Sequence, residues 1–330
     1  MPSCATAPRA TLLLLAYNQE RYVADAARSC CAQEGEALQI VLSDDASHDG
    51  THAILESVAA AYDGPHRVVV RRNERNLGIA AHYNRLIDET CGELLITAAG
   101  DDVSSPDRAA RLLAAWDATD RRADLITSHV FDVDSDGVDH GVLRVADLAA
   151  LGGIEGWCRR RPFVIGAGHA FTRRLMRRFG AMDGAIPYED QIIVFRALTS
   201  GGAVTIDTPL VRYRRGGESA KPAFDSAAQE HAWRLRRLGG EIAEREQLLR
   251  DAAVAGCLAE VSAALEPLRV RQAYLSRLYG ADSALARLQA LFMADGPSRA
   301  WRFSKWMQAT TAVARIRSAR RRSAATGRSA

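Results

Sequence analysis

Short apolar runs alternate with helical segments over the first 100 residues, and this alternation constrains the fold more than any other feature. Four runs are typical of buried strands: Thr11–Ala16, Leu38–Leu42, His66–Val70 and Leu94–Ala98. The segments between them have helical composition: Tyr22–Ala32, a stretch through Ala60, and Ile79–Glu89. Such alternation favours a mostly parallel sheet with helices on both faces. The predicted fold class is therefore α/β.

The rest of the chain is less regular. It predicts strands at Ala123–Phe131, Ala167–Phe171, Val204–Ile206 and Leu210–Tyr213, a turn at Asp132–His140, and helices at Thr172–Phe179 and Tyr188–Ser200. After Pro222, long stretches of Ala, Leu, Arg and Glu predict helices with breaks near Gly239-Gly240, Pro267, Gly280 and Gly296-Pro297. We therefore expect an N-terminal tail (1–8), an α/β domain (9–220), a helical extension (221–296) and a basic amphipathic tail (297–330).

The charge of the chain is unevenly distributed. The formal net charge is only +3, which gives no reason to expect a nucleic-acid partner. From Pro297 to Ala330 there are nine basic and no acidic residues, so the remaining chain carries −6. Trp301, Phe303 and Trp306 stand among these cations, a pattern that suits an anionic membrane surface. A final helix packed on the body, with a basic end, explains the same residues equally well.

The sequence also bears on the compartment. The apolar run Leu12–Ala16 is far shorter than the roughly 20 residues that span a bilayer, and no signal peptide is evident. The six cysteines lack metal-ligand spacing, which favours free thiols in a reducing compartment. We expect a cytoplasmic protein whose basic tail allows peripheral binding to the inner face of the membrane.

Polar clusters follow three of the predicted strands: Tyr17-Asn18, Asp44-Asp45 and Asp101-Asp102. In an open α/β sheet, the carboxyl ends of the strands meet at the edge where ligands bind. Adjacent carboxylates such as Asp101-Asp102 suit a hard divalent cation, Mg²⁺ or Mn²⁺, shared with substrate phosphates. The alternative for both acidic pairs is a solvated turn that caps the next helix.

A further acidic pair, Glu189-Asp190, stands at a predicted helix start. Acidic residues are favoured there by the helix dipole, so capping explains the pair without any chemistry. The functional alternative is a general base that takes a proton from an incoming hydroxyl.

Taken in order, YNQERY, SDDASHDGT, NLGIAAHYN, GDD, YEDQ and YRRGGES closely resemble the motifs of family 2 glycosyltransferases of the GT-A fold, over roughly residues 9 to 220. The resemblance implies an enzyme that moves a sugar from a nucleoside-diphosphate donor to an acceptor hydroxyl with inversion. The expected donor is a UDP- or dTDP-sugar. The expected acceptor is a saccharide or lipid-linked saccharide used in surface polysaccharide or glycolipid synthesis.

The resemblance also implies roles on the donor side. Tyr17 would help form the nucleotide pocket, and Asp45 would bind the base. Asn76, Gly78 and Asn84 would shape the wall of the donor site.

The resemblance assigns the chemistry to the remaining acidic residues. Asp101 would lie near the ribose and donor sugar, and Asp102 would coordinate the metal on the diphosphate. Asp190 would be the general base, with Glu189 beside it.

Two departures from the family pattern concern the metal. Gly100 stands where many relatives have a further Asp, and no His follows Tyr213-Arg214. Arg214 or Arg215 could contact the diphosphate instead. A non-catalytic protein that binds sugar nucleotides or a membrane surface, and that keeps the fold, is the alternative function.

Overall fold

The computed structural model describes residues 8–215, 224–281, 283–292 and 296–309. The chain divides into two compact units: Met1–Ala220 with Arg250–Cys257, and Lys221–Leu249 with Leu258–Ala330. We treat each unit by itself.

Within the described residues, nine strands form one sheet in the order β3-β2-β1-β4-β8-β6-β9-β5, with β7 paired to β6. The strands are β1 (Ala10–Ala16), β2 (Gln39–Asp44), β3 (Arg67–Arg72), β4 (Leu94–Ala99), β5 (Val103–Ser104), β6 (Leu125–Val133), β7 (Asp139–Leu143), β8 (Ala170–Thr172) and β9 (Ala203–Arg214). The strands β1 to β4 pair in parallel, as do β6 and β9, whereas β8 runs antiparallel to its neighbours β4 and β6. The predicted α/β class is confirmed, and the sheet is mixed rather than mostly parallel, because β5 and β7 also pair antiparallel, with β9 and β6.

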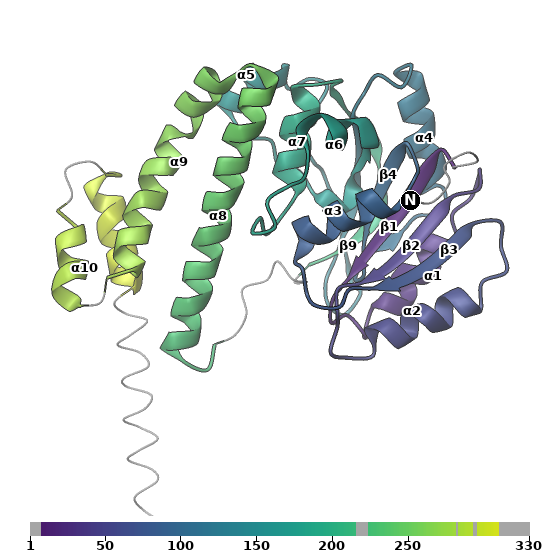
Figure 1. Ribbon diagram of the computed structural model, residues 1–330, viewed down its shortest axis with the longest axis horizontal. Helices are drawn as coiled ribbons and strands as arrows, with labels where there is room; N and C mark the ends of the chain where they lie inside the picture. Colours follow the sequence, from purple (N-terminus) through teal and green to yellow (C-terminus); the bar gives the residue numbers. More distant parts are fainter. Residues whose placement is uncertain (1–7, 216–223, 282, 293–295, 310–330) are drawn as a thin grey trace, which may run out of the picture. The chain divides into compact units, whose positions relative to one another are not determined.

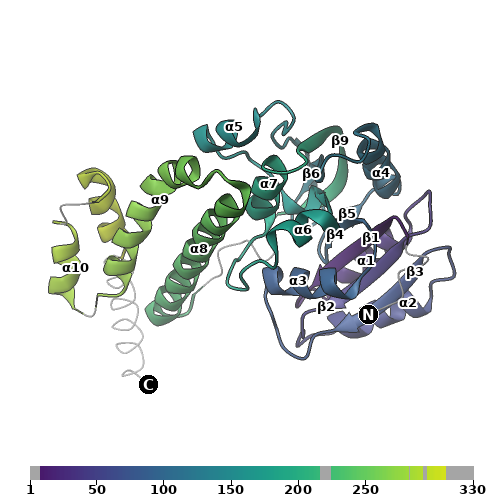
Figure 2. The same ribbon diagram turned by 45° about the horizontal axis from the view of Figure 1, so that its top comes forward.

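Helices cover both faces of this sheet (Figures 1 and 2). In the first unit they are α1 (Val23–Cys31), α2 (Thr51–Ala60), α3 (Ile79–Glu89), α4 (Arg108–Ala118), α5 (Gly153–Arg159), α6 (Arg173–Phe179) and α7 (Asp190–Leu198), with a 3₁₀ turn at Gly166–Gly168. One core packs α1, α2 and α4 against Leu12 and Leu14 of β1. On the other face, Tyr83 of α3 meets Phe171 of β8 edge to face, with ring centroids 6.3 Å apart.

The end of α8 (Ala227–Ala255) belongs to the first unit. There Asp251 accepts hydrogen bonds from Nε and Nη2 of Arg196 on α7, at 2.7 and 3.2 Å. Both side chains are buried, so this bidentate ion pair holds α7 against the end of α8.

The second unit is a helical hairpin of α8 and α9 (Leu258–Tyr279), followed by α10 (Ala284–Ala290) and a helix over residues 299–309 (Figure 1). Gln272 of α9 bonds to Arg245 and to the carbonyl of Glu241 on α8. Trp301 packs edge to face on the buried Tyr274. Most of the predicted basic tail, residues 310–330, lies outside the described residues.

Several local expectations are wrong. Val204–Ile206 and Leu210–Tyr213 belong to one strand, β9, which stays paired to β6 through register shifts at Ser128 to Val130. The turn predicted at Asp132–His140 is confirmed at its centre, residues 134–138, whereas its two ends belong to β6 and β7.

Two of the four predicted helix breaks are wrong, whereas α9 ends at Tyr279, at the predicted break near Gly280. The helix α8 runs through Gly239-Gly240 and α9 through Pro267, and the break falls at Gly256 with φ +79°. The long helices override the local cost of these residues, about 1 kcal/mol for a glycine.

Cys91 is disulfide-bonded, so the expectation of free thiols fails for that residue. In the described parts of the chain, every helix is too short or too polar to cross a bilayer.

Candidate active site

A cavity of about 700 Å³ opens where β1, β2 and β4 end. The parallel register places Ala16 beside Asp44 and Leu15 beside Ala99, so the residues that follow these strands meet at one edge. Nine of the predicted site residues line the cavity: Tyr17, Asp45, Asn76, Gly78, Asp101, Asp102, Glu189, Asp190 and Arg214. The predicted Asn84 and Arg215 are not among the lining residues.

Asp45 is buried and holds the loop between β3 and α3. Its carboxylate accepts hydrogen bonds from Asn73 Nδ2 at 2.6 Å and from the N–H groups of Leu77 and Gly78 at 2.9 and 3.0 Å. Asn76 Oδ1 accepts from the same Gly78 N–H at 2.9 Å. The loop that carries Asn76 and Gly78 is therefore fixed to the end of β2 by one carboxylate.

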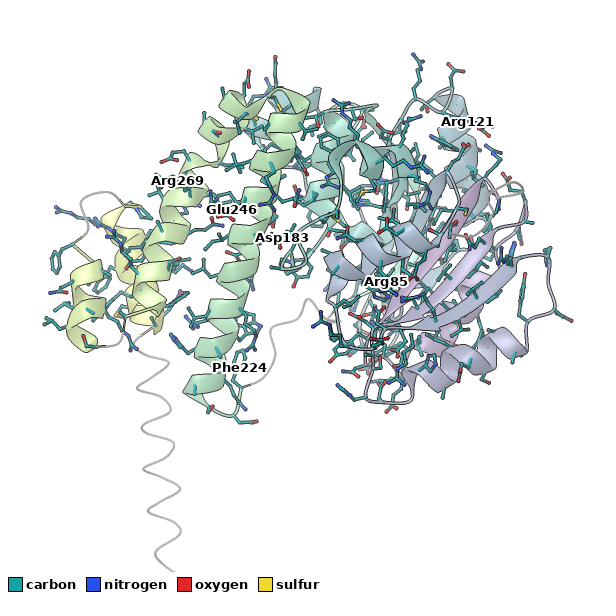
Figure 3. The ribbon with its side chains drawn as sticks, viewed as in Figure 1. Arg85, Arg121, Asp183, Phe224, Glu246 and Arg269 are labelled. Carbon is teal, nitrogen blue, oxygen red and sulfur yellow. The ribbon has the colours of Figure 1, made fainter. Side chains whose placement is uncertain are left out.

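Asn84 does not line the cavity, but it holds a loop that does. Its side-chain amide donates to the carbonyl of Met182 at 2.7 Å and accepts from the Met182 N–H at 3.0 Å. The residues that follow Met182 include Gly184 and Ile186, which do line the cavity. Figure 3 labels Arg85 on α3 and Asp183 on this loop, which mark the two segments that Asn84 joins.

Asp101 and Asp102 are adjacent buried carboxyls, and their ionised forms are disfavoured. Burial raises the pKa of both carboxyls, and the charge of Asp101 raises that of Asp102 further. The Arg214 N–H donates to Asp102 Oδ1 at 2.8 Å and offsets part of this cost.

The donor set of this pair fits a cation that is shared with a ligand. The described residues contain no group of three or more His, Cys, Asp or Glu side chains placed to hold a metal ion. Hard cations such as Mg²⁺ are commonly bound by one or two carboxylates together with substrate phosphates. Asp101 and Asp102 offer two hard carboxylate ligands, and a nearby cation would relieve their repulsion.

Glu189 and Asp190 form a second pair at the start of α7. The Gly166 N–H donates to Asp190 Oδ2 at 3.1 Å. A Cβ at Gly166 would stand 2.7 Å from Glu189 Oε1, so a larger residue in this turn would displace the Glu189 side chain. Burial, followed by the charge of Asp190, raises the pKa of Glu189 to about 8.

The two predicted arginines differ in position. The Arg214 guanidinium lies 4.3 Å from the ring centre of Tyr22 and donates to the carbonyls of Asp101 and Asp134, at 3.2 and 2.9 Å. Arg215 instead pairs with Asp132. Of the two, Arg214 alone lines the cavity.

The structure explains Gly100. A Cβ at this position would lie 2.4 Å from Gln19 Oε1 and 2.9 Å from Ala16 Cβ. A third acidic side chain before Asp101-Asp102 therefore has no room in this chain.

Sequence reasoning missed two polar lining residues on α3. His82 is buried, with a ring nitrogen 2.5 Å from Ser43 Oγ, and burial lowers its pKa to about 4. Burial also raises the pKa of Tyr83 well above its usual range. The NLGIAAHYN motif contains both residues, and their helical spacing after Gly78 was the signal that could have found them.

This chain is similar in sequence to known glycosyltransferases. The family model described as "Glycosyl transferase family 2" matches residues 11–178, slightly more than half of the chain. "Putative glycosyltransferase EpsE" of Bacillus subtilis (strain 168) is 32% identical over 32% of this chain and 38% of its own length. "Succinoglycan biosynthesis protein ExoO" of Rhizobium meliloti (strain 1021) is 31% identical over 46% of this chain. That match covers 41% of ExoO, so the chain spans about two fifths of these two relatives.

Solved structures agree on the fold. Residues 1–349 of TarS of S. aureus, in complex with UDP-GlcNAc, superpose with a TM-score of 0.54 at 16% identity, over 92% of this chain and 81% of that TarS chain. The mannosyltransferase PcManGT from Pyrobaculum calidifontis, in complex with GDP-Man and Mn²⁺, gives 0.52 at 16% identity, over 94% and 88%. The predicted GT-A fold with C-terminal helices is confirmed, and the chain belongs to glycosyltransferase family 2.

Proposed function

We propose that the protein is an inverting glycosyltransferase that moves a sugar from a nucleoside-diphosphate donor to an acceptor hydroxyl. One observation carries this proposal: a single cavity contains both acidic pairs, Asp101-Asp102 from β4 and Glu189-Asp190 from α7. The two pairs come from separate segments of the fold. A donor-binding group and a general base can therefore lie on different sides of the same sugar.

The donor is a nucleoside-diphosphate sugar, for which a UDP- or dTDP-sugar is our expectation. TarS and PcManGT were solved with UDP-GlcNAc and GDP-Man, which supports this ligand class. Tyr17, Asp45 and the loop of Asn76 and Gly78 are proposed to hold the nucleotide. Arg214 adds positive charge near the diphosphate, whereas Arg215 lies outside the cavity lining.

A divalent cation, Mg²⁺ or Mn²⁺, is proposed to be held by Asp102 with Asp101 beside it. When bound, it would neutralise charge on the diphosphate and make it a better leaving group. The Mn²⁺ in the PcManGT complex supports this choice.

Asp190 is proposed to be the general base. As the acceptor oxygen attacks the anomeric carbon, its proton passes to the Asp190 carboxylate and the bond to the diphosphate breaks on the opposite side of the sugar. The electron pair of that bond leaves with the nucleotide, and the anomeric centre inverts. No covalent intermediate with the protein is needed.

We propose that burial gives the two carboxyls of the Glu189-Asp190 pair different roles. Two adjacent carboxylates do not readily both ionise, and Glu189, with a pKa raised to about 8, keeps its proton at neutral pH. Asp190 is then the member of the pair that is proposed to accept the proton.

The acceptor is proposed to be a saccharide or lipid-linked saccharide of surface polysaccharide synthesis, and the similarity to ExoO supports this setting. Phe163, 55% exposed at the cavity, gives the face of a sugar ring an apolar surface. We place the protein in the cytoplasm, with its basic tail at the inner face of the membrane.

Replacing Asp190 by Asn should lower transfer by about 100-fold or more, because the base is lost while the acceptor oxygen for Gly166 N–H remains. Nucleotide affinity should stay nearly unchanged. Steady-state transfer and nucleotide titration measure the two effects, with Asp25→Asn on α1 as the control. Unchanged turnover would remove Asp190 from catalysis, and a wild-type protein that binds nucleotide without turnover would favour the non-catalytic alternative.

Asp102→Asn should abolish stabilisation by a nucleoside diphosphate that depends on Mn²⁺. A ligand at 100 times its dissociation constant stabilises the folded protein by about 2.7 kcal/mol, which thermal unfolding detects. Asp107→Asn, at the start of α4, should keep the full shift. Equal shifts with and without Mn²⁺ in the wild type would argue against a metal at this site.

Glu189→Gln should change the pH dependence of stability. Since the pKa of Glu189 is raised from 4.5 to about 8, the folded state binds more protons than the unfolded chain between these values, and stability falls as pH rises through this window. Gln mimics the protonated acid, so the variant should gain on the order of 1–3 kcal/mol over the wild type at pH 9 and least at pH 5. Denaturant unfolding at both pH values measures this gain, and a difference that does not vary with pH would contradict it.

The full chain should sediment with vesicles that contain anionic lipid and remain in solution with neutral ones. Phe303 and Met307, 54% and 43% exposed, should add apolar contact, so a Phe303→Ser, Met307→Ser double variant should bind more weakly. Val254→Ser, an exposed apolar site elsewhere, is the control. Equal binding to both vesicle types would exclude the electrostatic attraction proposed here.

A further inference from the structure

A guanidinium lies fully buried next to the cavity wall. Arg108, the first residue of α4, is 0% exposed. Its Nη1 donates to Ser104 Oγ at 2.9 Å, and its Nη2 donates to the carbonyls of Thr97 and Ala167 at 2.7 and 2.6 Å. One side chain therefore joins β4, β5 and the distant segment that contains Ala167.

Two of these segments lead into or out of the donor-side pair. Thr97 is on β4, which ends two residues before Asp101. Ser104 is on β5, two residues after Asp102. The contacts of Arg108 thus bracket Asp101-Asp102 from both sides along the chain.

The third segment leads to the proposed base. Ala167 follows Gly166, whose N–H holds the Asp190 carboxylate. Thr97 adds a second link, because its hydroxyl donates to the Gly166 carbonyl at 2.7 Å. From Arg108 the path to Asp190 runs through Ala167 and Gly166.

A contribution to the stability of the folded protein does not explain why the cation of Arg108 is buried at this position. Burial lowers the pKa of Arg108 to about 10, although the charge of Asp102 raises it in part. Within the described residues its Nε has no hydrogen-bond partner, and its other donors meet neutral oxygens. A buried charge without an ion pair is costly, and an apolar side chain would fill such a space at lower cost.

We propose that Arg108 is a positioning residue that sets the separation between the donor-side pair Asp101-Asp102 and the base Asp190. This inference rests on the proposed function. In-line transfer needs the donor carbon and the base held in one geometry, and a misplacement of about 1 Å can lower a rate 100-fold. Arg108 supplies that constraint from the interior, without touching either substrate.

Two variants separate geometry from charge. Arg108→Lys keeps the cation but loses the planar fork that reaches three acceptors, and Arg108→Gln loses both. The matched controls are Arg111→Lys and Arg111→Gln, on the exposed side of the same helix. Nucleotide titration counts the intact donor sites in each preparation, and turnover is expressed per site.

Both Arg108 variants should bind nucleotide with a dissociation constant within about threefold of the wild type and lose at least about tenfold in turnover per site. Amide hydrogen exchange at residues 163–168 should accelerate, while α3 remains unchanged. Turnover that falls only in proportion to the number of nucleotide sites would mean a merely structural role. Full turnover in Arg108→Lys would mean that charge alone suffices. Either result overturns the inference.

Thr97→Val extends the test if the Arg108 variants do not fold. This near-isosteric change removes the hydroxyl that holds the Gly166 carbonyl, and it should produce the same split between binding and turnover. A wild-type protein without turnover on any donor would sink the proposed function instead. Hydrogen exchange would still decide the inference in that case, since unchanged exchange at residues 163–168 refutes it.

Discussion

The backbone register of β1 with its two parallel neighbours decides where the acids that follow β2 and β4 lie. At the end of β1, the Ala16 carbonyl accepts from the Asp45 N–H and the Leu15 carbonyl accepts from the Gly100 N–H, both at 2.9 Å. A shift by one residue would reverse the direction of each side chain and send these acids into the helix-covered faces. The cavity is thus a consequence of strand pairing before any side chain contributes.

Gathering five carboxylates in one cavity is unfavourable unless the backbone offsets their charge. N–H groups do so at three places: Leu77 and Gly78 at Asp45, Arg214 at Asp102, and Gly166 at Asp190. At Glu189, burial and the neighbouring charge of Asp190 outweigh the backbone donor and raise the pKa to about 8. Burial raises the pKa of Asp102 as well, although the Arg214 N–H lowers it in part.

The sequence predicted the parallel half of the sheet because each strand is a short apolar run with polar residues after it. It failed where the decisive contacts are distant. The segment Asp207-Thr208-Pro209 suggests a break, yet pairing to β6 carries β9 through it. Arg108 looks like an ordinary surface arginine at a helix start, since its acceptors at Thr97 and Ala167 appear only in three dimensions. Motifs located the acids, but tertiary contacts decide which of them share a cavity and which residues hold them.

The crowding at Gly100 has a consequence for how this site can change over generations. Gln19 Oε1 occupies the space that a side chain at residue 100 would need. A third acid at this position would require Gln19 to turn away and Ala16 to shift, since the same Cβ would also lie 2.9 Å from Ala16 Cβ. The Gln19 side chain accepts the Tyr17 N–H at 3.2 Å, so its displacement would also remove a contact at the cavity wall, where Tyr17 lies. Positions 16, 19 and 100 are therefore coupled, and a substitution at one of them changes which residues the other two tolerate.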